Sequence, residues 1–181
     1  RNQKETIDTV NLDFASDRDL FKLLETNVLL GREPQNLGIR NLEMSVFNPE
    51  NILSVLPHID SQALKILHIK SNPLGHVQSA IDLRQVVELG QWKNVKELTL
   101  NSFVIQNKIQ EMNLEDKSHI KIHVESLFLE DLCYLTERFH TEPHHKEFRI
   151  AYNTLNRVHE TTKWNMDKND LYFAIPEDQV L

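Results

Sequence analysis

The sequence predicts an α/β protein, an irregular leucine-rich-repeat-like array of strand–helix units that forms a curved, mostly parallel sheet. One short apolar run recurs along the chain, as Ile39-x-x-Leu42-x-Met44, Leu64-x-x-Leu67-x-Ile69 and Val95-x-x-Leu98-x-Leu100. This spacing is typical of a buried strand. Counted over all seven expected strands, equivalent positions lie 23 to 31 residues apart, which is close to the period of leucine-rich repeats.

The first half of the chain holds four expected strands, near residues 10–14, 42–46, 67–69 and 98–100. Helices are expected between them. The first begins after Ser16, which precedes an acidic turn, and ends at Gly31. The second begins at Asn48-Pro49. The third runs from Ile81 to Trp92, with Val86, Leu89 and Trp92 facing inward.

The second half continues the pattern less regularly. A weak helical stretch spans residues 105–112, and strands are expected at 120–124, 148–152 and 171–175. The clearest helix spans 128–139, and a last one spans 154–164. We take as equivalent strand positions Leu12, Leu42, Leu67, Leu98, Ile122, Phe148 and Leu171. A doubly wound sheet is the alternative, but the glycine fingerprint that such folds often use is missing.

Composition favours one globular domain over residues 1–181. The chain is 40% hydrophobic and 26% charged, a balance that argues against disorder. Its 20 basic residues against 27 acidic ones give a net charge of -7. Nucleic acid is therefore disfavoured as a direct ligand, because a phosphate backbone is bound by a basic patch.

The chain lacks the marks of a secreted or membrane protein. Cys133 is its one cysteine, so no intrachain disulfide can form. No apolar stretch approaches the roughly 18 to 20 residues that span a bilayer, and no signal-peptide run is present. We expect an intracellular protein, cytoplasmic or nuclear. Because the sequence begins at Arg1, we also expect it to be a fragment of a longer protein.

Four stretches carry a resemblance to a known family: residues 64–69, 91–98, 130–132 and 148–150. The most specific is Gln-Trp-Lys-Asn at the start of the second. Together they resemble the nematode FTH domain, which is found C-terminal to the F-box in F-box A proteins. The resemblance covers about residues 35–155 and implies a ubiquitin-ligase adaptor that recruits another protein, without catalysis or a cofactor. No F-box is recognisable in this chain.

The expected sheet also predicts a binding surface. Side chains alternate between the two faces of a strand, so the neighbours of the core positions face outward. One outward row is Glu43, His68, Thr99, His123, Arg149 and Tyr172, and the next is Ser45, Lys70, Asn101, Glu125, Ala151 and Ala174. We therefore predict that a protein partner contacts Glu43, His68, Lys70, Thr99, Asn101, His123, Glu125 and Arg149.

Other interpretations of the same residues stay open. The two rows are also what an ordinary solvated sheet face would show. The partner could instead contact the helix side, or an aromatic anchor made by Trp164 with Tyr172 and Phe173. RNA binding by the sheet face would require a basic stripe with exposed aromatic residues, and the two rows lack it.

A metal-dependent enzyme or a histidine-using hydrolase is the alternative function. Zinc requires three or four converging ligands, and the nine histidines do not predict such a set. His119 and His123 lie on one expected strand, while Pro143 separates His140 from His144. Cys133 is expected to be a buried thiol, and Glu130 with Asp131 the acidic first turn of a helix. We expect Trp92 to close a helix against the sheet.

Overall fold

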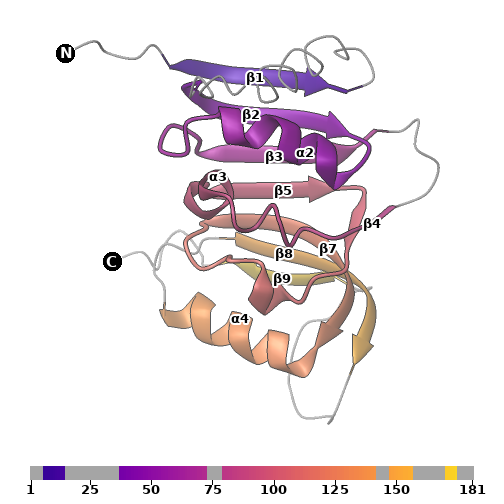
Figure 1. The fold of residues 1–181 in the computed structure, drawn as a ribbon. Coiled ribbons are helices and arrows are strands. Elements are labelled where there is room, and N and C mark those ends of the chain that lie inside the picture. The colour runs from indigo at the N-terminus through magenta and orange to yellow at the C-terminus, as the bar shows by residue number, and fades with distance from the viewer. Residues whose placement is uncertain (1–5, 15–36, 73–78, 142–146, 157–169, 175–181) are drawn as a thin grey trace.

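The computed structural model describes residues 6–14, 37–72, 79–141, 147–156 and 170–174 (Figure 1). Within them nine strands form one sheet: β1 Ile7–Asp13, β2 Ile39–Val46, β3 Ile66–Ser71, β4 Ser79–Ile81, β5 Glu97–Asn101, β6 Phe103–Ile105, β7 His119–Phe128, β8 Glu147–Asn156 and β9 Asp170–Ala174. The described helices are α2 Pro49–Val55, α3 Gly90–Asn94 and α4 Leu129–Thr141, with short 3-10 turns η1 Leu56–His58 and η2 Ile109–Glu111.

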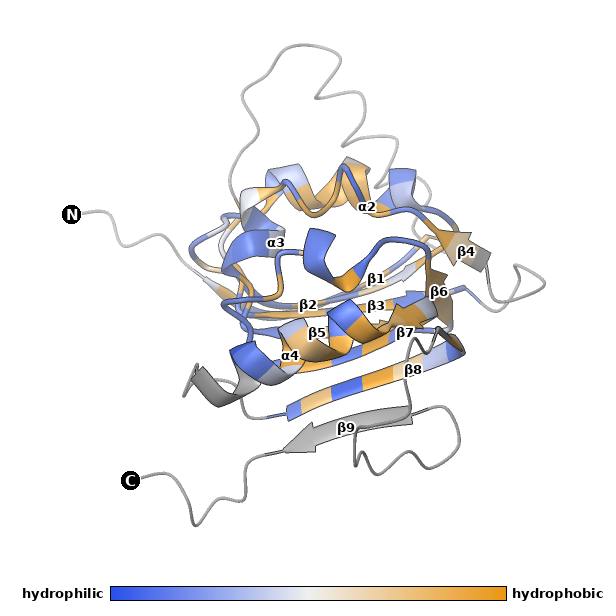
Figure 2. Cartoon of the chain, turned by 90° about the horizontal axis from the view of Figure 1, so that it is seen from below, coloured by the Kyte–Doolittle hydropathy of each residue, from blue (hydrophilic) through white to orange (hydrophobic). Residues whose placement is uncertain are grey.

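The main line of the sheet runs in the order β1, β2, β3, β5, β7, β8, β9. All of these neighbours are parallel except β8 and β9, which are antiparallel. Two short strands form a branch, because β6 pairs with the later part of β7 and β4 pairs with β6. The predicted α/β class with a curved, mostly parallel sheet is therefore confirmed (Figures 1 and 2).

A repeated hydrogen bond marks where each unit enters the sheet. The backbone amide of Lys65 donates to the carbonyl of Arg40, Lys96 to Lys65, and Ser118 to Lys96, each at 2.8 Å. The residue before each of these is buried: Ile39, Leu64, Val95 and Lys117. The apolar run seen in the sequence thus continues into a fourth copy as Lys117-x-x-Ile120-x-Ile122, with a lysine at its first position.

This ladder corrects the predicted equivalences. Leu42, Leu67, Leu98 and Phe148 share one transverse row, as predicted, but Ile120 and not Ile122 completes it. At the edges of the sheet the register partners are Val10 and Phe173, where Leu12 and Leu171 were predicted. The errors are each two residues, because alternating apolar residues offer two equally good choices of core position on each of these strands.

Figure 2 shows the helices on one side of the sheet, and the hydrophobic core fills the space between them. Helix α2 begins as predicted: Pro49 is its first residue and the side chain of Asn48 accepts a hydrogen bond from the amide of Asn51 at 3.1 Å. Ile52 and Val55 of α2 are buried against the sheet. Helix α4 is also confirmed, with Leu132 and Leu135 buried.

The helix predicted from Ile81 to Trp92 is wrong for most of its length. Ile81 ends β4, the next residues form turns, and only α3 is helical. Asp82 and Asn107 cause this break, since Asp82 accepts from the amide of Arg84 at 3.0 Å and Asn107 accepts from the amide of Leu83 at 2.7 Å. The weak helical stretch at 105–112 is likewise β6 followed by η2.

Two other predicted helices fall mainly on residues that the structure does not describe. The helix predicted for 16–31 lies outside the described residues. Of the one predicted for 154–164, the first three residues belong to β8 and the rest lie outside. Trp164 lies there too, and the side chains of Tyr172 and Phe173 are not described, so the aromatic-anchor interpretation stays untested.

Candidate partner-binding surface

The eight residues predicted to contact a partner all lie on the sheet face opposite the helices, which we call the open face. Their core-side neighbours are buried, including Leu42, Leu67, Leu98, Ile122 and Phe148. The eight side chains themselves are exposed or half-buried: Glu43, His68, Lys70, Thr99, Asn101, His123, Glu125 and Arg149. Alternation along parallel strands places them there.

The register reorders these residues and adds one that sequence reasoning missed. The first row across the sheet is Glu43, His68, Thr99, Lys121 and Arg149. Lys121 takes the place predicted for His123, and His123 moves to the next row beside Ala151. Had Lys117 been accepted as the buried first position of the run, the sequence would have predicted this order.

On β2 and β3 the open face carries a closed ion pair. Lys70 Nζ donates to Glu43 Oε1 at 2.8 Å. This hydrogen bond and the lysine charge lower the pKa of the Glu43 carboxyl, and the same contact raises the pKa of Lys70. Both side chains remain substantially exposed. Charge on this half of the face is therefore already compensated within the protein.

On β5, β7 and β8 the open face carries a shallow hollow of about 190 Å³. The open-face residues that line it are Asn101, Ser102, Lys121, His123, Arg149 and Ala151. His123 is held in place, since its Nε2 lies 2.9 Å from Asn153 Oδ1. We call these six residues the cationic hollow.

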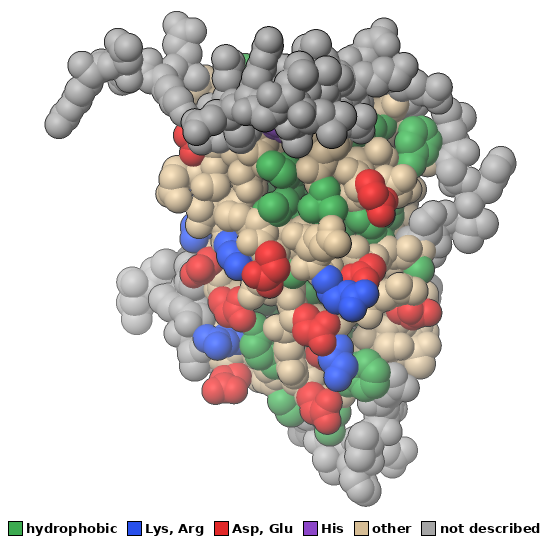
Figure 3. All heavy atoms as spheres, viewed as in Figure 1, with side chains coloured by type: hydrophobic (Ala, Val, Ile, Leu, Met, Phe, Trp, Pro, Cys, Tyr) green, Lys and Arg blue, Asp and Glu red, His purple; other side chains and the backbone are tan. Residues whose placement is uncertain are grey.

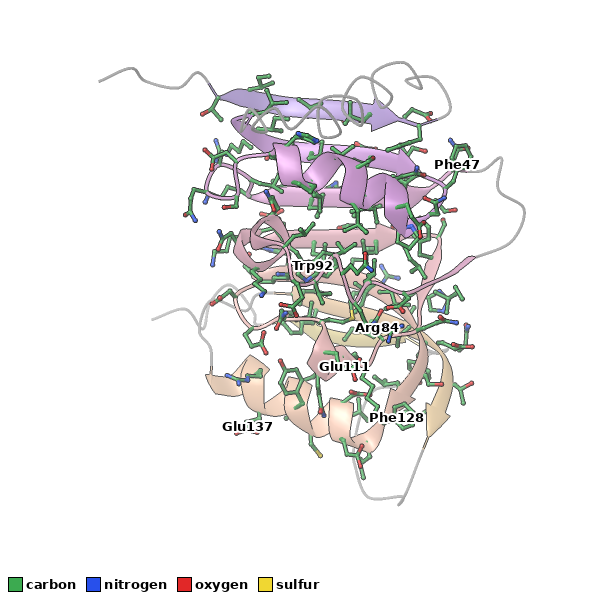
Figure 4. All side chains as sticks on the ribbon, in the orientation of Figure 1. Phe47, Arg84, Trp92, Glu111, Phe128 and Glu137 are labelled. Carbon is green, nitrogen blue, oxygen red and sulfur yellow. The ribbon has the colours of Figure 1, made fainter. Side chains whose placement is uncertain are left out.

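Trp92 has the structural role predicted for it, in the core on the helix side of the sheet. Trp92 stands on α3 (Figure 4). Its side chain is fully buried, and the indole Nε1 donates to the carbonyl of Met112 at 2.7 Å. Lys117 is also fully buried; its Nζ donates to the Trp92 carbonyl at 2.7 Å and lies 5.6 Å from the centre of the indole ring. Burial lowers the pKa of Lys117 to about 8. Its stem fills the position of Leu64 and Val95 in the neighbouring units.

Exposed charges on the helix side are mixed in sign, as Figure 3 shows. Two pairs are in contact there: Arg84 with Asp82, and Lys93 with Glu88 at 2.8 Å. A larger hollow of about 400 Å³ lies between α2 and residues 82–86. Its lining mixes Leu53 and Val86 with the Asp82–Arg84 pair, so nothing in it favours one ligand chemistry.

The start of α4 explains its acidic residues and corrects one prediction. Asp131 is buried and accepts a hydrogen bond from the amide of Phe128 at 3.0 Å, and its burial raises the pKa of its carboxyl. The predicted role in the first helical turn is confirmed. Cys133, in contrast, is exposed. The prediction of a buried thiol is wrong because Asp131, Leu132 and Leu135 form the inward face of the helix.

The histidines do not gather in the part of the chain that the structure describes. His119 and His123 lie on β7, as predicted, and no three histidine, cysteine or acidic side chains of the described residues are placed to hold a metal ion. The side chains of His140, His144 and His145 lie outside that part. No specific observation therefore favours the hydrolase or metal-enzyme alternative. Among the described helices, none is both long and apolar enough to cross a membrane.

A family model, the FTH domain, matches residues 22–168. The chain belongs to the FTH domain family. The match contains the whole of the region, 35–155, on which the sequence resemblance was based, and it spans β2 to β8. A comparison with curated proteins and one with solved structures found no significant match. The open-face residues of this FTH domain, from Glu43 on β2 to Arg149 on β8, all lie within the matched region.

Proposed function

We propose that this FTH domain is a protein-interaction module, the partner-recruiting domain of an F-box-type adaptor, and that it binds without turnover or a cofactor. The observation that carries the proposal is the open face. The described helices all lie on one side of a parallel sheet, and none of them covers the other side. Parallel sheets usually have both faces covered, except in repeat proteins that bind partners on a concave sheet.

The chemistry of the open face supports a protein ligand. Across five strands, its first row presents a carboxylate, an imidazole, a hydroxyl and two cations in that order. Most of these side chains are exposed. A surface of mixed charge recognises a partner by complementary charge and shape. A nucleic-acid face would be more uniformly basic, which also disagrees with a net charge of -7.

The architecture supports a preformed surface. The open-face residues stand on strands whose other side packs into one continuous core, from Leu42 on β2 to Ile150 on β8. Side chains on such strands are held in fixed positions relative to one another, so a partner does not have to order them on binding. This is the mode expected of a recruiting domain that offers shape and charge, with no reaction at the surface.

The test compares capture by three forms of the domain, immobilised as bait in a lysate of cells that express it. The first is the native chain, and the second carries Glu43→Ala, His68→Ala and Arg149→Ala on the open face. The third is a helix-side control with Arg84→Ala, Glu88→Ala and Lys93→Ala, which are exposed charged residues. Bound proteins are identified by mass spectrometry, and the thermal transition of each form is measured.

We expect a protein that is retained by the native and helix-side forms and lost from the open-face variant, with similar thermal transitions for all three. Equal retention by all three forms would remove the open face from the proposal. Retention of nothing by the native chain would contradict recruitment by this domain.

A further inference from the structure

The cationic hollow brings two cations, Lys121 and Arg149, to the edge of a depression in the open face. Among the described residues, its lining includes Lys121, Arg149 and the imidazole of His123, and no carboxylate. It also includes the amide of Asn101 and the hydroxyl of Ser102. Charged and neutral hydrogen-bond donors therefore surround a space of about 190 Å³.

The backbone creates this depression. β5 pairs with β7 only from Glu97–His119 to Thr99–Lys121. The next residue of the chain that pairs with β7 is Ile105 on β6, opposite Val124. Between these points lies Ser102, whose φ of 64° turns the chain from β5 into β6. Residues other than glycine seldom adopt this conformation. The two strands separate there, and Lys121 and His123 border the gap.

Lys121 contrasts with the lysine of the neighbouring strand pair. Lys70 is bound to Glu43 at 2.8 Å, whereas Lys121 makes no ion pair or hydrogen bond with another described residue. The carboxylates of Glu97 and Glu147 belong to a different row, beside His119. Asp170 occupies the register position beside Ala151 on β9. The ammonium of Lys121 is thus the group in the hollow that an external anion would neutralise.

We propose that the cationic hollow receives an aspartate or glutamate side chain from an extended acidic segment of the recruited protein. The inference rests on the proposed function and specifies the partner's chemistry. A carboxylate accepts from two or three donors, which the ammonium of Lys121, the amide of Asn101 and the hydroxyl of Ser102 supply. A continuous phosphate backbone fits worse, because its binding needs a broad basic stripe, and Lys70 on the same face is already paired with Glu43.

The test uses a short synthetic peptide of alternating serine and glutamate as probe, titrated into the isotope-labelled chain and followed by amide chemical shifts. A second peptide has glutamine in place of every glutamate. A third has one phosphoserine among glutamines. The variant is Lys121→Gln. Its matched control is Lys93→Gln, which makes the same charge change on the helix side, at an exposed lysine that is already paired with Glu88.

We expect the glutamate peptide to shift the amides of Ser102, Lys121 and His123, and the glutamine peptide to leave them unchanged. Lys121→Gln should weaken binding by about tenfold, as loss of one charge-assisted contact does, while Lys93→Gln should change it by less than about twofold. Equal binding of the glutamine peptide, or equal effects of the two lysine variants, would overturn the inference. Shifts by the phosphoserine peptide alone would replace the carboxylate with a phosphate ligand.

The two proposals can fail separately. If the glutamate peptide leaves the hollow unchanged while the open-face triple variant still loses its captured protein, recruitment stands and the acidic segment is wrong. If the peptide binds the hollow but no protein is captured from lysate, the hollow is an anion site and the recruiting function is wrong.

Discussion

The two faces of the same strands differ in what their residues do. On β3, Leu67 and Ile69 are buried in the core, whereas His68 and Lys70, their immediate neighbours, are exposed. The same alternation holds on β5 and β7. The helix side thus holds the burial that stabilises the fold, and the open face holds side chains that contribute little to it. Substitutions on the first face should change folding, and those on the second should change recognition.

Trp92→Ala should have the largest effect on the helix side. The side chain is fully buried and its indole hydrogen-bonds to the carbonyl of Met112. Truncation would leave a cavity and an unpaired carbonyl, so we expect the free energy of unfolding to fall by about 3 to 5 kcal/mol. Urea unfolding followed by circular dichroism measures it.

Trp92→Phe separates the two contributions at that site. Phenylalanine keeps most of the buried apolar area but cannot donate to the Met112 carbonyl. The free energy of unfolding should therefore fall clearly less in Trp92→Phe than in Trp92→Ala. A loss below about 1 kcal/mol for Trp92→Ala would contradict the contrast between the faces, since a buried tryptophan would then stabilise no more than a surface residue.

Lys117 should make the stability of the helix side depend on pH. Its pKa is about 8 in the folded chain, against an ordinary 10.5, because burial disfavours the ammonium. Between these values the unfolded chain holds a proton that the folded chain has released, so the free energy of unfolding rises with pH. One pKa unit corresponds to 1.36 kcal/mol, so we expect the free energy of unfolding to increase by about 2 to 3 kcal/mol from pH 8 to pH 10.

Lys117→Met is the matched variant, because methionine fills a similar volume without a titrating group. Its stability should change little across the same pH window when both proteins are unfolded in urea at each pH. Tyr134 sets the highest pH at which this comparison is useful. Burial, with its hydrogen bond to Glu115, raises its pKa above the ordinary 10.0, so its ionisation opposes folding above that pH. If the free energy of unfolding of Lys117→Met rose equally from pH 8 to pH 10, Lys117 would not be the cause of the pH dependence.

The sequence predicted the sheet well because its signal is local. Each strand from β2 to β8 along the main line contains an apolar run with the spacing that alternation requires, and Asn48-Pro49 starts α2 through contacts within one turn. The helix expected over 81–92 failed for a different reason. Its apolar spacing was suitable, but Asn107, distant in sequence, accepts from the amide of Leu83 and holds that segment in a turn. A periodicity argument cannot detect such a contact.

The candidate surface was predicted as a face but not as an arrangement. Alternation alone placed eight residues on the open face. The order of the row depends on register, and register was set at β7 by Lys117, a buried lysine in a position that other units fill with Ile39, Leu64 and Val95. Since lysine is almost never fully buried without a partner, the sequence favoured Ile122 as the core residue. Lys121 was missed for that reason.

The smallest effect should come from the open face. We expect His68→Thr to change the free energy of unfolding by no more than about 0.5 kcal/mol, because the side chain is exposed and threonine suits a strand. Leu67→Ala, one residue away and fully buried, is the matched control and should lower it by about 2 to 5 kcal/mol. Both are measured by urea unfolding under one set of conditions.

A large loss for His68→Thr would mean that part of the chain packs over the open face and draws stability from it. The cationic hollow would then lie beneath a covering segment, and a partner would have to displace that segment to reach Lys121. If His68→Thr left the free energy of unfolding unchanged while Leu67→Ala lowered it, β3 would stabilise the fold through its core-side residues only. The other face could then change its side chains to suit a partner without loss of the fold.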